Sequence, residues 1–306
     1  MHNSPLKIPM AVSTQGLVKR FGADKALVDL QFRVPGGGVY LLAGTNGAGK
    51  STLLRMLLGL QAPTSGEIRV LDLDPRLQGP AVRSQVGYVP ETTNWGYSWL
   101  RVGQMLDHLR RFYPKWDTAY ATRLSQALEL RLKHPLGALS KGQTRCVQIM
   151  AALAHRPKLL LLDELTDGLD PLFRHRVLTI FAQHLADTDC TAIMSTHLVS
   201  EIEGLANHVG VLRKGVLLYQ GSTDQLLGQM FRFRLEAPRG WTPPEVLRRR
   251  ILQEEAGIGR TPAFIIAGQE CATAALLKNS GARVEASMRL TLDEAVLALL
   301  QSDQGL

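Results

Sequence analysis

The glycine-rich segment at residues 44–51 reads Gly44-Thr45-Asn46-Gly47-Ala48-Gly49-Lys50-Ser51. It matches the phosphate-binding pattern G-x-x-x-x-G-K-[ST], whose glycines let backbone N–H groups turn inward around phosphates. The run Val39 to Ala43 predicts a strand before it, and Gly49 to Leu60 predicts a helix whose positive N-terminus faces the same anion. We expect Lys50 to reach the β- and γ-phosphates and Ser51 to ligate Mg²⁺. A plain glycine turn is the alternative, and the register of Lys50 and Ser51 argues against it.

A second candidate element is the apolar run Leu159 to Leu162, which ends in Asp163 and Glu164. On its own, such a strand would more simply end in two solvated acids. Beside a phosphate-binding loop it predicts a buried strand that delivers two carboxylates to the phosphates. We expect Asp163 to hold Mg²⁺ and Glu164 to polarise the attacking water as general base.

The stretch Leu139-Ser140-Lys141-Gly142-Gln143 precedes a helical run to Ala154. Ser140 and Gln143 have the S-x-x-Q spacing of a capping box, so this stretch predicts a helix start. A capped helix N-terminus is also an anion site, so the structural role leaves room for a functional one.

Strand-like and helix-like runs alternate from about Ala11 to Met230, which predicts an α/β layer fold with a mainly parallel sheet. Val86 to Val89 and Thr191 to Ser195 are further buried-strand candidates. The runs Leu27 to Val34 and Glu67 to Leu71 are candidates for antiparallel pairing. Residues from about 92 to 157 are helical in pattern and predict a helical subdomain.

Beyond residue 230 the nucleotide-binding motifs stop, and residues 231–306 predict a small α/β accessory domain. Its expected strands are Phe231 to Leu235, Ala263 to Ala267 and Arg283 to Ser287, and its expected helices are Cys271 to Lys278 and Leu292 to Gln301. We therefore expect a flexible N-terminus at 1–10, an ATPase domain at 11–230 and this appendage.

Composition excludes several classes of protein. The 306 residues carry a net charge of +8, dispersed without a long Lys/Arg cluster, so we expect no nucleic-acid partner, while an anionic membrane nearby is compatible with the charge. No uninterrupted apolar run approaches the roughly 18 residues of a membrane helix, and the N-terminus lacks the apolar core of a secretion signal. Cys146, Cys190 and Cys271 have no metal-ligand spacing and are expected to be buried thiols in a reducing compartment.

Over residues 11 to 306 the chain resembles the ATPases of ABC transporters, a P-loop NTPase family. Residues 139–143 resemble the LSGGQ signature of that family, and the remaining motifs fall in the family's order. They are Phe21 at the adenine-stacking position, Glu91 after Gly87-Tyr88-Val89-Pro90 at the Q-loop, Gly168-Leu169-Asp170 at the D-loop, and Ser195-Thr196-His197 at the H-switch.

The sequence departs from the family pattern at four positions. Lys141 replaces the first glycine of the signature, Glu91 replaces the Q-loop glutamine, Leu165 replaces a proline, and Asp167 replaces a serine in the D-loop. Glu91 can still ligate Mg²⁺ through water. The proline that Leu165 replaces is a conformational aid in the family, so its replacement need not abolish hydrolysis. Asp167 affects the communication between the two sites of a dimer.

The resemblance implies a head-to-tail dimer with ATP between the two chains, closing on ATP and opening after hydrolysis. It implies catalytic roles for Lys50, Glu164 and His197, and metal ligation by Ser51, Glu91 and Asp163. The nucleotide-binding positions are Phe21, Gly44, Thr45, Asn46, Gly47, Ala48, Gly49, Lys50, Ser51 and Thr52 of one chain, with Ser140, Gly142 and Gln143 of the other.

The resemblance also implies a separate transmembrane permease subunit and a peripheral place on the cytoplasmic face of the membrane. The dimer is left open between two identical subunits and two paralogues. A soluble ABC ATPase of nucleic-acid repair or translation is the alternative; only 113 residues separate Lys50 from Asp163, too few for the long coiled coil of repair members. Export is favoured over import, because residues 87–91, 112–117 and the short appendage resemble bacterial export ATPases.

The segment from Trp95 to Trp116 is rich in aromatic residues and follows Glu91. Core packing of a helical subdomain is the simpler interpretation of these rings. The functional interpretation is a groove for a cytoplasmic helix of the permease, because aromatic residues are enriched at interface hot spots. We hypothesise that at least one of Trp95, Tyr97 and Trp99 is exposed in the isolated subunit.

Overall fold

The computed structural model describes residues 9–92, 96–238, 240–255 and 262–302. Its central sheet has six strands in the order β10-β9-β4-β8-β7-β6. All neighbouring pairs are parallel except β9 with β10, which is antiparallel, so the expected mainly parallel core is confirmed. These strands are β4 (Gly38–Gly44), β6 (Val86–Val89), β7 (Leu159–Asp163), β8 (Thr191–Thr196), β9 (His208–Arg213) and β10 (Val216–Ser222).

An antiparallel sheet lies beside the first one and is organised around one long strand, β1 (Met10–Phe21). Its other strands are β2 (Asp24–Leu30), β3 (Arg33–Pro35) and β5 (Ser65–Val70), and each of them pairs antiparallel with β1. The expectation that 27–34 and 67–71 are antiparallel strands holds, but they pair with β1 rather than with each other. The run 27–34 is also divided in two, because β2 ends at Leu30 and β3 begins at Arg33. Since β1 begins at Met10, that residue does not belong to a flexible terminus.

Helix α1 (Lys50–Leu57) follows β4 and packs its apolar face between the two sheets. It is shorter than the sequence pattern predicted, because Gly59 takes φ 67° and ends the helix in the left-handed conformation. The short helix α2 (Gly79–Arg83) follows β5, and α6 (Pro171–Ala186) connects β7 to β8.

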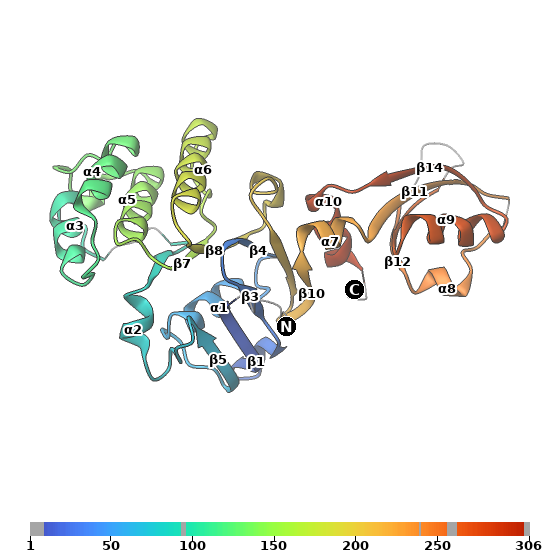
Figure 1. Ribbon diagram of the computed structural model, residues 1–306, viewed down its shortest axis with the longest axis horizontal. Helices are drawn as coiled ribbons and strands as arrows, with labels where there is room; N and C mark the ends of the chain where they lie inside the picture. Colours follow the sequence, from blue (N-terminus) through green and yellow to red (C-terminus); the bar gives the residue numbers. More distant parts are fainter. Residues whose placement is uncertain (1–8, 93–95, 239, 256–261, 303–306) are drawn as a thin grey trace, which may run out of the picture.

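The helical subdomain forms one end of the molecule (Figure 1). It contains α3 (Val102–Arg110), α4 (Thr118–Ala127), the 3₁₀ turn η1 (Leu136–Ala138) and α5 (Lys141–Leu153). Helix α5 returns the chain to the sheet and packs against β6, so the helical subdomain is tied to the core through α5.

The C-terminal residues fold into a third sheet at the opposite end of the molecule (Figure 1). Its order is β12-β13-β11-β14, all antiparallel, and the chain runs β-α-β-β-α-β, which is the ferredoxin-like arrangement. The elements are β11 (Met230–Glu236), α8 (Glu245–Arg248), β12 (Ile251–Glu255), β13 (Ala263–Ala267), α9 (Glu270–Asn279) and β14 (Arg283–Arg289). The sequence pattern missed α8 and β12.

The last helix, α10 (Leu292–Gln301), packs against the ATPase core rather than standing apart. Its buried side chains Leu292, Val296 and Leu299 belong to the same apolar cluster as β9. It also contacts α7 (Thr223–Leu227) and η2 (Val199–Glu201), the turn that follows β8.

The cysteines differ from expectation at one position. Cys146 and Cys190 are buried, but Cys271, in the first turn of α9, is exposed.

Candidate functional site

The phosphate-binding loop joins β4 to α1, and its glycines are dictated by crowding. A Cβ on Gly44 would lie 2.3 Å from the Leu212 carbonyl oxygen, and one on Gly49 would lie 2.5 Å from that of Ala26. Gly49 also has φ 106° and directly precedes the helix. The loop therefore brings its backbone close to neighbouring strands, as the sequence pattern predicts, and places Ser51 and Thr52 in the first turn of α1.

Lys50 is buried, with 6% of its surface exposed, and its ammonium points back along the loop. Nζ donates to the Gly44 carbonyl at 2.8 Å and to that of Thr45 at 3.4 Å. It lies 3.5 Å from Oε1 of Glu164. The loop lysine and the proposed base thus face each other.

The carboxylates at the end of β7 are positioned by the neighbouring strand β8. Asp163 lies opposite Ser195 in the parallel ladder, and the Ser195 hydroxyl donates to Asp163 Oδ1 at 2.5 Å. The Glu164 amide donates to the Ser195 carbonyl at 3.0 Å, while Glu164 itself has φ 49°. This turn in the chain directs the two adjacent carboxylates into different surroundings.

Asp163 Oδ2 is buried and has no hydrogen-bond partner within the part of the chain that the structure describes. A buried carboxylate oxygen without a partner is costly. It is the kind of oxygen ligand that Mg²⁺ prefers. The donor set of Asp163 and the Ser51 hydroxyl therefore fits a magnesium ion.

His197 follows β8 and completes the carboxylate's contacts. Its Nδ1 lies 2.9 Å from Glu164 Oε2, and its side chain is nearly half exposed. Glu164 therefore has one oxygen toward Lys50 and the other toward His197. The structure brings together the loop, the two carboxylates and the histidine predicted from sequence.

Two other predicted residues lie at the margins of this cluster. Phe21 ends β1 with 48% of its surface exposed, and Lys19 Nζ lies 4.9 Å from its ring centre. The Phe21 side chain is thus exposed enough for another ring to stack on it. Glu91 follows β6 with an exposed side chain. No hydrogen bond joins the Glu91 side chain to Ser51 or Asp163 among the described residues.

The signature residues form a separate group at the N-terminus of α5. Ser140 Oγ accepts from the Gln143 amide at 3.2 Å, and Gln143 Oε1 accepts from the Ser140 amide at 3.0 Å, so the capping box is confirmed. Gly142 lies beside the Gly168 carbonyl. Within the described ranges, no hydrogen bond joins Ser140, Gly142 or Gln143 to Lys50 or Glu164.

The D-loop departures have visible contacts. Asp167 Oδ2 accepts from Lys141 Nζ at 2.8 Å, and this hydrogen bond is the main reason the pKa of Asp167 is lowered. The two substitutions, Lys141 in the signature and Asp167 in the D-loop, therefore pair with each other. Leu165 is buried in the apolar core, with 3% of its surface exposed.

Three residues to which the sequence analysis gave no role of their own hold the site in place. Ser195 bonds Asp163, Glu201 accepts from the Thr166 hydroxyl and pairs with Arg174, and Arg145 bonds the backbone at Pro90 and Glu91. Only Ser195 had a signal, because it opens the Ser-Thr-His motif.

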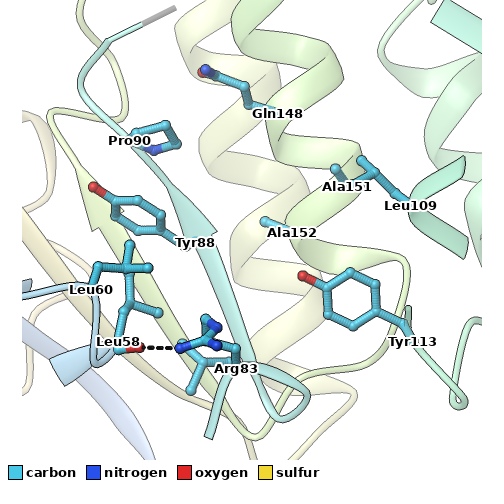
Figure 2. A pocket seen from close by; sticks show the side chains of 11 residues that line it. Leu58, Leu60, Arg83, Tyr88, Pro90, Leu109, Tyr113, Gln148, Ala151 and Ala152 are labelled. Carbon is cyan, nitrogen blue, oxygen red and sulfur yellow. Dashed lines mark hydrogen bonds between the residues drawn. The ribbon is translucent and has the colours of Figure 1, made fainter. Parts of the chain in front are cut away.

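A pocket of about 250 Å³ lies between the sheet core and the helical subdomain, beside the Glu91 segment. Figure 2 shows Tyr88 and Leu60 on the core side and Leu109 and Tyr113 on the helical side, with α5 behind. Arg83 lies at its base and donates to the Leu58 carbonyl at 3.1 Å.

A second hollow, about 530 Å³, lies on α3 and the preceding turn. It is lined by Tyr97, Trp99, Leu100, Gln104, Met105, Asp107, His108 and Arg111. Tyr97 and Trp99 are 55% and 74% exposed, as hypothesised for at least one of the three rings, while Trp95 lies outside the described residues. The rings therefore line this hollow, and the pocket beside the Glu91 segment is lined by other side chains.

Comparison with known proteins gives one consistent result. The family model described as ABC transporter matches residues 27–167. The chain is 30% identical over 224 residues to the ABC transporter ATP-binding protein YtrB of Bacillus subtilis (strain 168), covering 73% of this chain and 76% of YtrB. It is 36% identical over 225 residues to the Nod factor export ATP-binding protein I of Bradyrhizobium diazoefficiens, covering 72% and 73% of the two chains.

Two further comparisons agree. The bacitracin transport ATP-binding protein BcrA of Bacillus licheniformis is 32% identical over 216 residues, covering 70% of this chain and 71% of BcrA. A solved ATP binding subunit of an ABC transporter superposes with a TM-score of 0.65 at 28% identity, covering 71% of this chain and 91% of that structure.

Proposed function

Because the chain belongs to the ATP-binding subunits of ABC transporters, whose members hydrolyse ATP, we propose that the cluster around Lys50, Glu164 and His197 is its hydrolytic site. The observation that carries this proposal is the position of the Glu164 carboxylate between Lys50 Nζ and His197 Nδ1. A carboxylate held in this way beside a phosphate-binding loop is placed to act on the terminal phosphate.

The loop binds the phosphates through its backbone and through Lys50. Amides of residues 45–49 and the first turn of α1 supply N–H donors, and Lys50 adds a positive charge. Phe21, exposed at the end of β1, supplies a ring on which adenine stacks.

Asp163 and Ser51 would hold Mg²⁺, and Glu91 would contact it through water. The ion supplies charge neutralisation at the β- and γ-phosphates when bound. The Ser195 hydroxyl donates to Asp163 Oδ1, which orients the carboxylate and leaves Oδ2 available for the ion.

Glu164 accepts the proton of the attacking water, and His197 fixes the orientation of that carboxylate. A positioned general base contributes typically ~10²–10⁴ in rate. His197 is partly exposed on the open side of the site, so it is also placed to contact the terminal phosphate.

Two chains associate head to tail, so that Ser140, Gly142 and Gln143 of one chain cover the nucleotide held by the other. This arrangement gives the signature residues a nucleotide to contact, since no hydrogen bond joins them to Lys50 or Glu164 within the described part of one chain. The N-terminus of α5 is capped by its own side chains, which fixes its geometry for an incoming phosphate.

The membrane partner is a separate permease, and its cytoplasmic helix docks between the sheet core and the helical subdomain. The pocket of about 250 Å³ offers an apolar wall with Tyr88, Leu109 and Tyr113 next to the Glu91 segment. Among the described residues, no helix has the length and hydropathy needed to span a bilayer. We place the subunit on the cytoplasmic face of the membrane.

The transport direction we propose is export. Of the relatives described above, one is named for Nod factor export and one for bacitracin transport. None of the relatives described above is named for nucleic-acid repair or translation, so that alternative is not retained.

The experiment that tests this function is co-purification with the permease, followed by reconstitution in liposomes. We expect the subunit to leave detergent-solubilised membranes with one integral membrane protein and to show ATPase activity that changes when the permease is present. The Glu164→Gln variant should co-purify with the permease in the same amount as the wild-type chain but should lose ATPase activity. Recovery of the wild-type chain without any membrane protein, and with ATPase activity dependent on DNA or ribosomes, would overturn the proposal.

A further inference from the structure

Arg145 is a fully buried charge on α5, five positions after Ser140. Burying a guanidinium is expensive unless its donors are used. Among the described residues it has no carboxylate in hydrogen-bond or ion-pair contact. A buried arginine kept without such a partner indicates that its hydrogen bonds serve a specific contact.

That contact is the backbone of the segment that carries Glu91. Arg145 donates from Nη1 to the Pro90 carbonyl and from Nη2 to the Glu91 carbonyl, the latter at 2.9 Å. Nη1 also lies 3.2 Å from Gln148 Oε1. Gln148, one turn further along α5, donates to the Thr92 carbonyl at 2.9 Å. Three consecutive carbonyls are thus held by two side chains of one helix.

These hydrogen bonds of Arg145 and Gln148 join two parts of the site that face different nucleotides. Glu91 belongs to the half that holds this chain's own ATP, and Ser140 caps the N-terminus of the same helix α5, which faces the partner's ATP. A helix of 13 residues moves as a unit, because its backbone hydrogen bonds resist bending. A shift of the Glu91 backbone is therefore carried to the signature.

Carboxylates of the hydrolytic site act electrostatically on Arg145. Burial lowers the pKa of its guanidinium, and the carboxylates of Asp167, Asp163, Glu91 and Glu164 oppose that effect from a distance. These carboxylates belong to or border the hydrolytic site. A change in charge there alters the field that Arg145 experiences.

We propose that Arg145 is a positioning residue that couples the Glu91 segment to the signature helix, so that binding of ATP in one half of the chain sets the geometry of the half offered to the partner. This inference rests on the proposed function and adds a route between the two nucleotide sites. Gln148 supports the same coupling through Thr92.

The test is hydrogen–deuterium exchange of the full chain with and without Mg-ATP, in the Glu164→Gln background that prevents turnover. With Arg145 intact, we expect ATP to change exchange both in the peptide over residues 86–92 and in the peptide over residues 139–146. With Arg145→Met, the first change should persist and the second should be lost. Arg156→Met, an arginine of the same subdomain that pairs with Asp117, is the matched control and should keep both changes.

A kinetic measurement separates positioning from simple stabilisation. Arg145→Met in the wild-type background should lower kcat on the order of tenfold, within the range of ordinary coupling between sites, while the Kd for ATP stays unchanged. Arg145→Lys, which keeps the charge but cannot span two carbonyls, should be intermediate. If Arg145→Met does not fold, Gln148→Ala should show a partial loss of the signature response, because it removes the contacts of Gln148 with Thr92 and with Arg145 but keeps those of Arg145 with Pro90 and Glu91.

The proposal is wrong if ATP leaves residues 139–146 unchanged when Arg145 is intact, if Arg145→Met keeps the full response, or if kcat and ATP affinity fall together. Failure of the dimer model is a separate result. In that case the Glu164→Gln chain with Arg145 intact would form no ATP-dependent dimer. The comparison of hydrogen–deuterium exchange between the chain with Arg145 intact and the Arg145→Met chain would still decide the role of Arg145.

Discussion

Glu164 and His197 are joined by a contact of 2.9 Å between Oε2 and Nδ1, although they lie on different strand ends. The contact exists because β7 and β8 are parallel neighbours, so residues just past their carboxyl ends meet at one edge of the sheet. Lys50 approaches the other oxygen of Glu164 at 3.5 Å. The same carboxylate is thus oriented from two sides.

Replacing Glu164 by Gln should separate binding from turnover. The amide keeps the shape and a contact to His197 but cannot accept a proton, so we expect phosphate release to fall ~10²-fold or more. This corresponds to a barrier increase of at least ~2.7 kcal/mol. ATP binding should survive, and size-exclusion chromatography with ATP should show an accumulated dimer.

Glu236→Gln, an exposed carboxylate in the C-terminal unit, serves as the control and should release phosphate at the normal rate. Normal turnover by Glu164→Gln would show that another group is the base.

Replacing Lys50 by Ala should act on affinity. It removes the buried ammonium from the phosphate-binding loop, where a hydrogen bond to a charged group is worth about 1.5–3 kcal/mol. We expect the Kd for ATP, measured by calorimetry, to rise by roughly 10- to 150-fold. Lys25→Ala, at an exposed position on β2, should leave the Kd unchanged. Equal affinities of the two variants would contradict the assignment of Lys50.

The parts of this site that could be predicted from sequence are those encoded within a few residues. The loop at 44–51 specifies strand, turn and helix in one short segment, and Asp163-Glu164 is recognisable because a buried strand precedes it. The capping box at Ser140 is likewise local, since cap and partner are three residues apart.

The parts that could not be predicted depend on contacts between distant segments. Strand β1 carries no simple alternation, because Gly16 with φ 58° and its register shifts interrupt the pleat. Helix α8 has only four residues and follows two prolines, so it has no period to detect. The role of Arg145 was hidden because its acceptors are backbone carbonyls more than fifty positions away, and carbonyls carry no sequence signal.

Two buried histidines should make the protein sensitive to mild acid. Burial lowers the pKa of His155 and of His184 from 6.5 to about 4, and for His184 the nearby Arg156 adds to the effect. The folded state therefore keeps both rings neutral where the unfolded chain takes up protons. The stability they contribute is complete above pH 6.5 and is lost as the pH falls from 6.5 toward 4.

Urea unfolding at pH 7, 6 and 5 checks this expectation. Each histidine should lower the free energy of unfolding by about 1.4 kcal/mol per pH unit within that window. His184→Phe removes one titrating ring and should halve the slope, whereas His108→Phe, at an exposed position, should leave it unchanged. If the free energy of unfolding of the wild-type chain does not change between pH 6.5 and 5, the two histidines are not buried in their neutral form.

Helix α10 should depend on charges at both of its ends. Glu203 accepts from the Leu292 amide at its N-terminus at 2.7 Å, and Arg213 donates to the carbonyls of Leu300 and Ser302 at its C-terminus, at 3.0 Å for Leu300. Both charges have the sign that the helix dipole favours.

Arg213→Met should therefore lower the free energy of unfolding by about 1–2 kcal/mol, measured by urea denaturation at pH 7. Arg248→Met, which breaks an exposed pair with Glu245 and an exposed hydrogen bond to the Pro243 carbonyl, should change it by well under ~1 kcal/mol. Equal effects of the two substitutions would mean that Arg213 does not anchor α10.

The exposed ring of Trp99 should matter for assembly rather than for folding. Trp99 is 74% exposed and lines the hollow on α3 together with Tyr97, close in sequence to the Glu91 segment. Its removal costs little packing in the isolated chain, so Trp99→Ala should leave the melting temperature and the basal ATPase rate nearly unchanged. Rings that become buried in an interface are frequent hot spots, so binding to the permease should weaken by about 2 kcal/mol or more.

The matched control is Phe112→Ala, because Phe112 is 63% exposed on the same subdomain but does not line the hollow. We expect Phe112→Ala to bind the permease with wild-type affinity, and Tyr97→Ala to resemble Trp99→Ala because the two rings share one surface. Binding is measured by titrating the labelled subunit into permease-containing nanodiscs. If Trp99→Ala and Phe112→Ala bind equally well, the hollow on α3 does not contact the permease, and docking is confined to the pocket between Tyr88 and Tyr113.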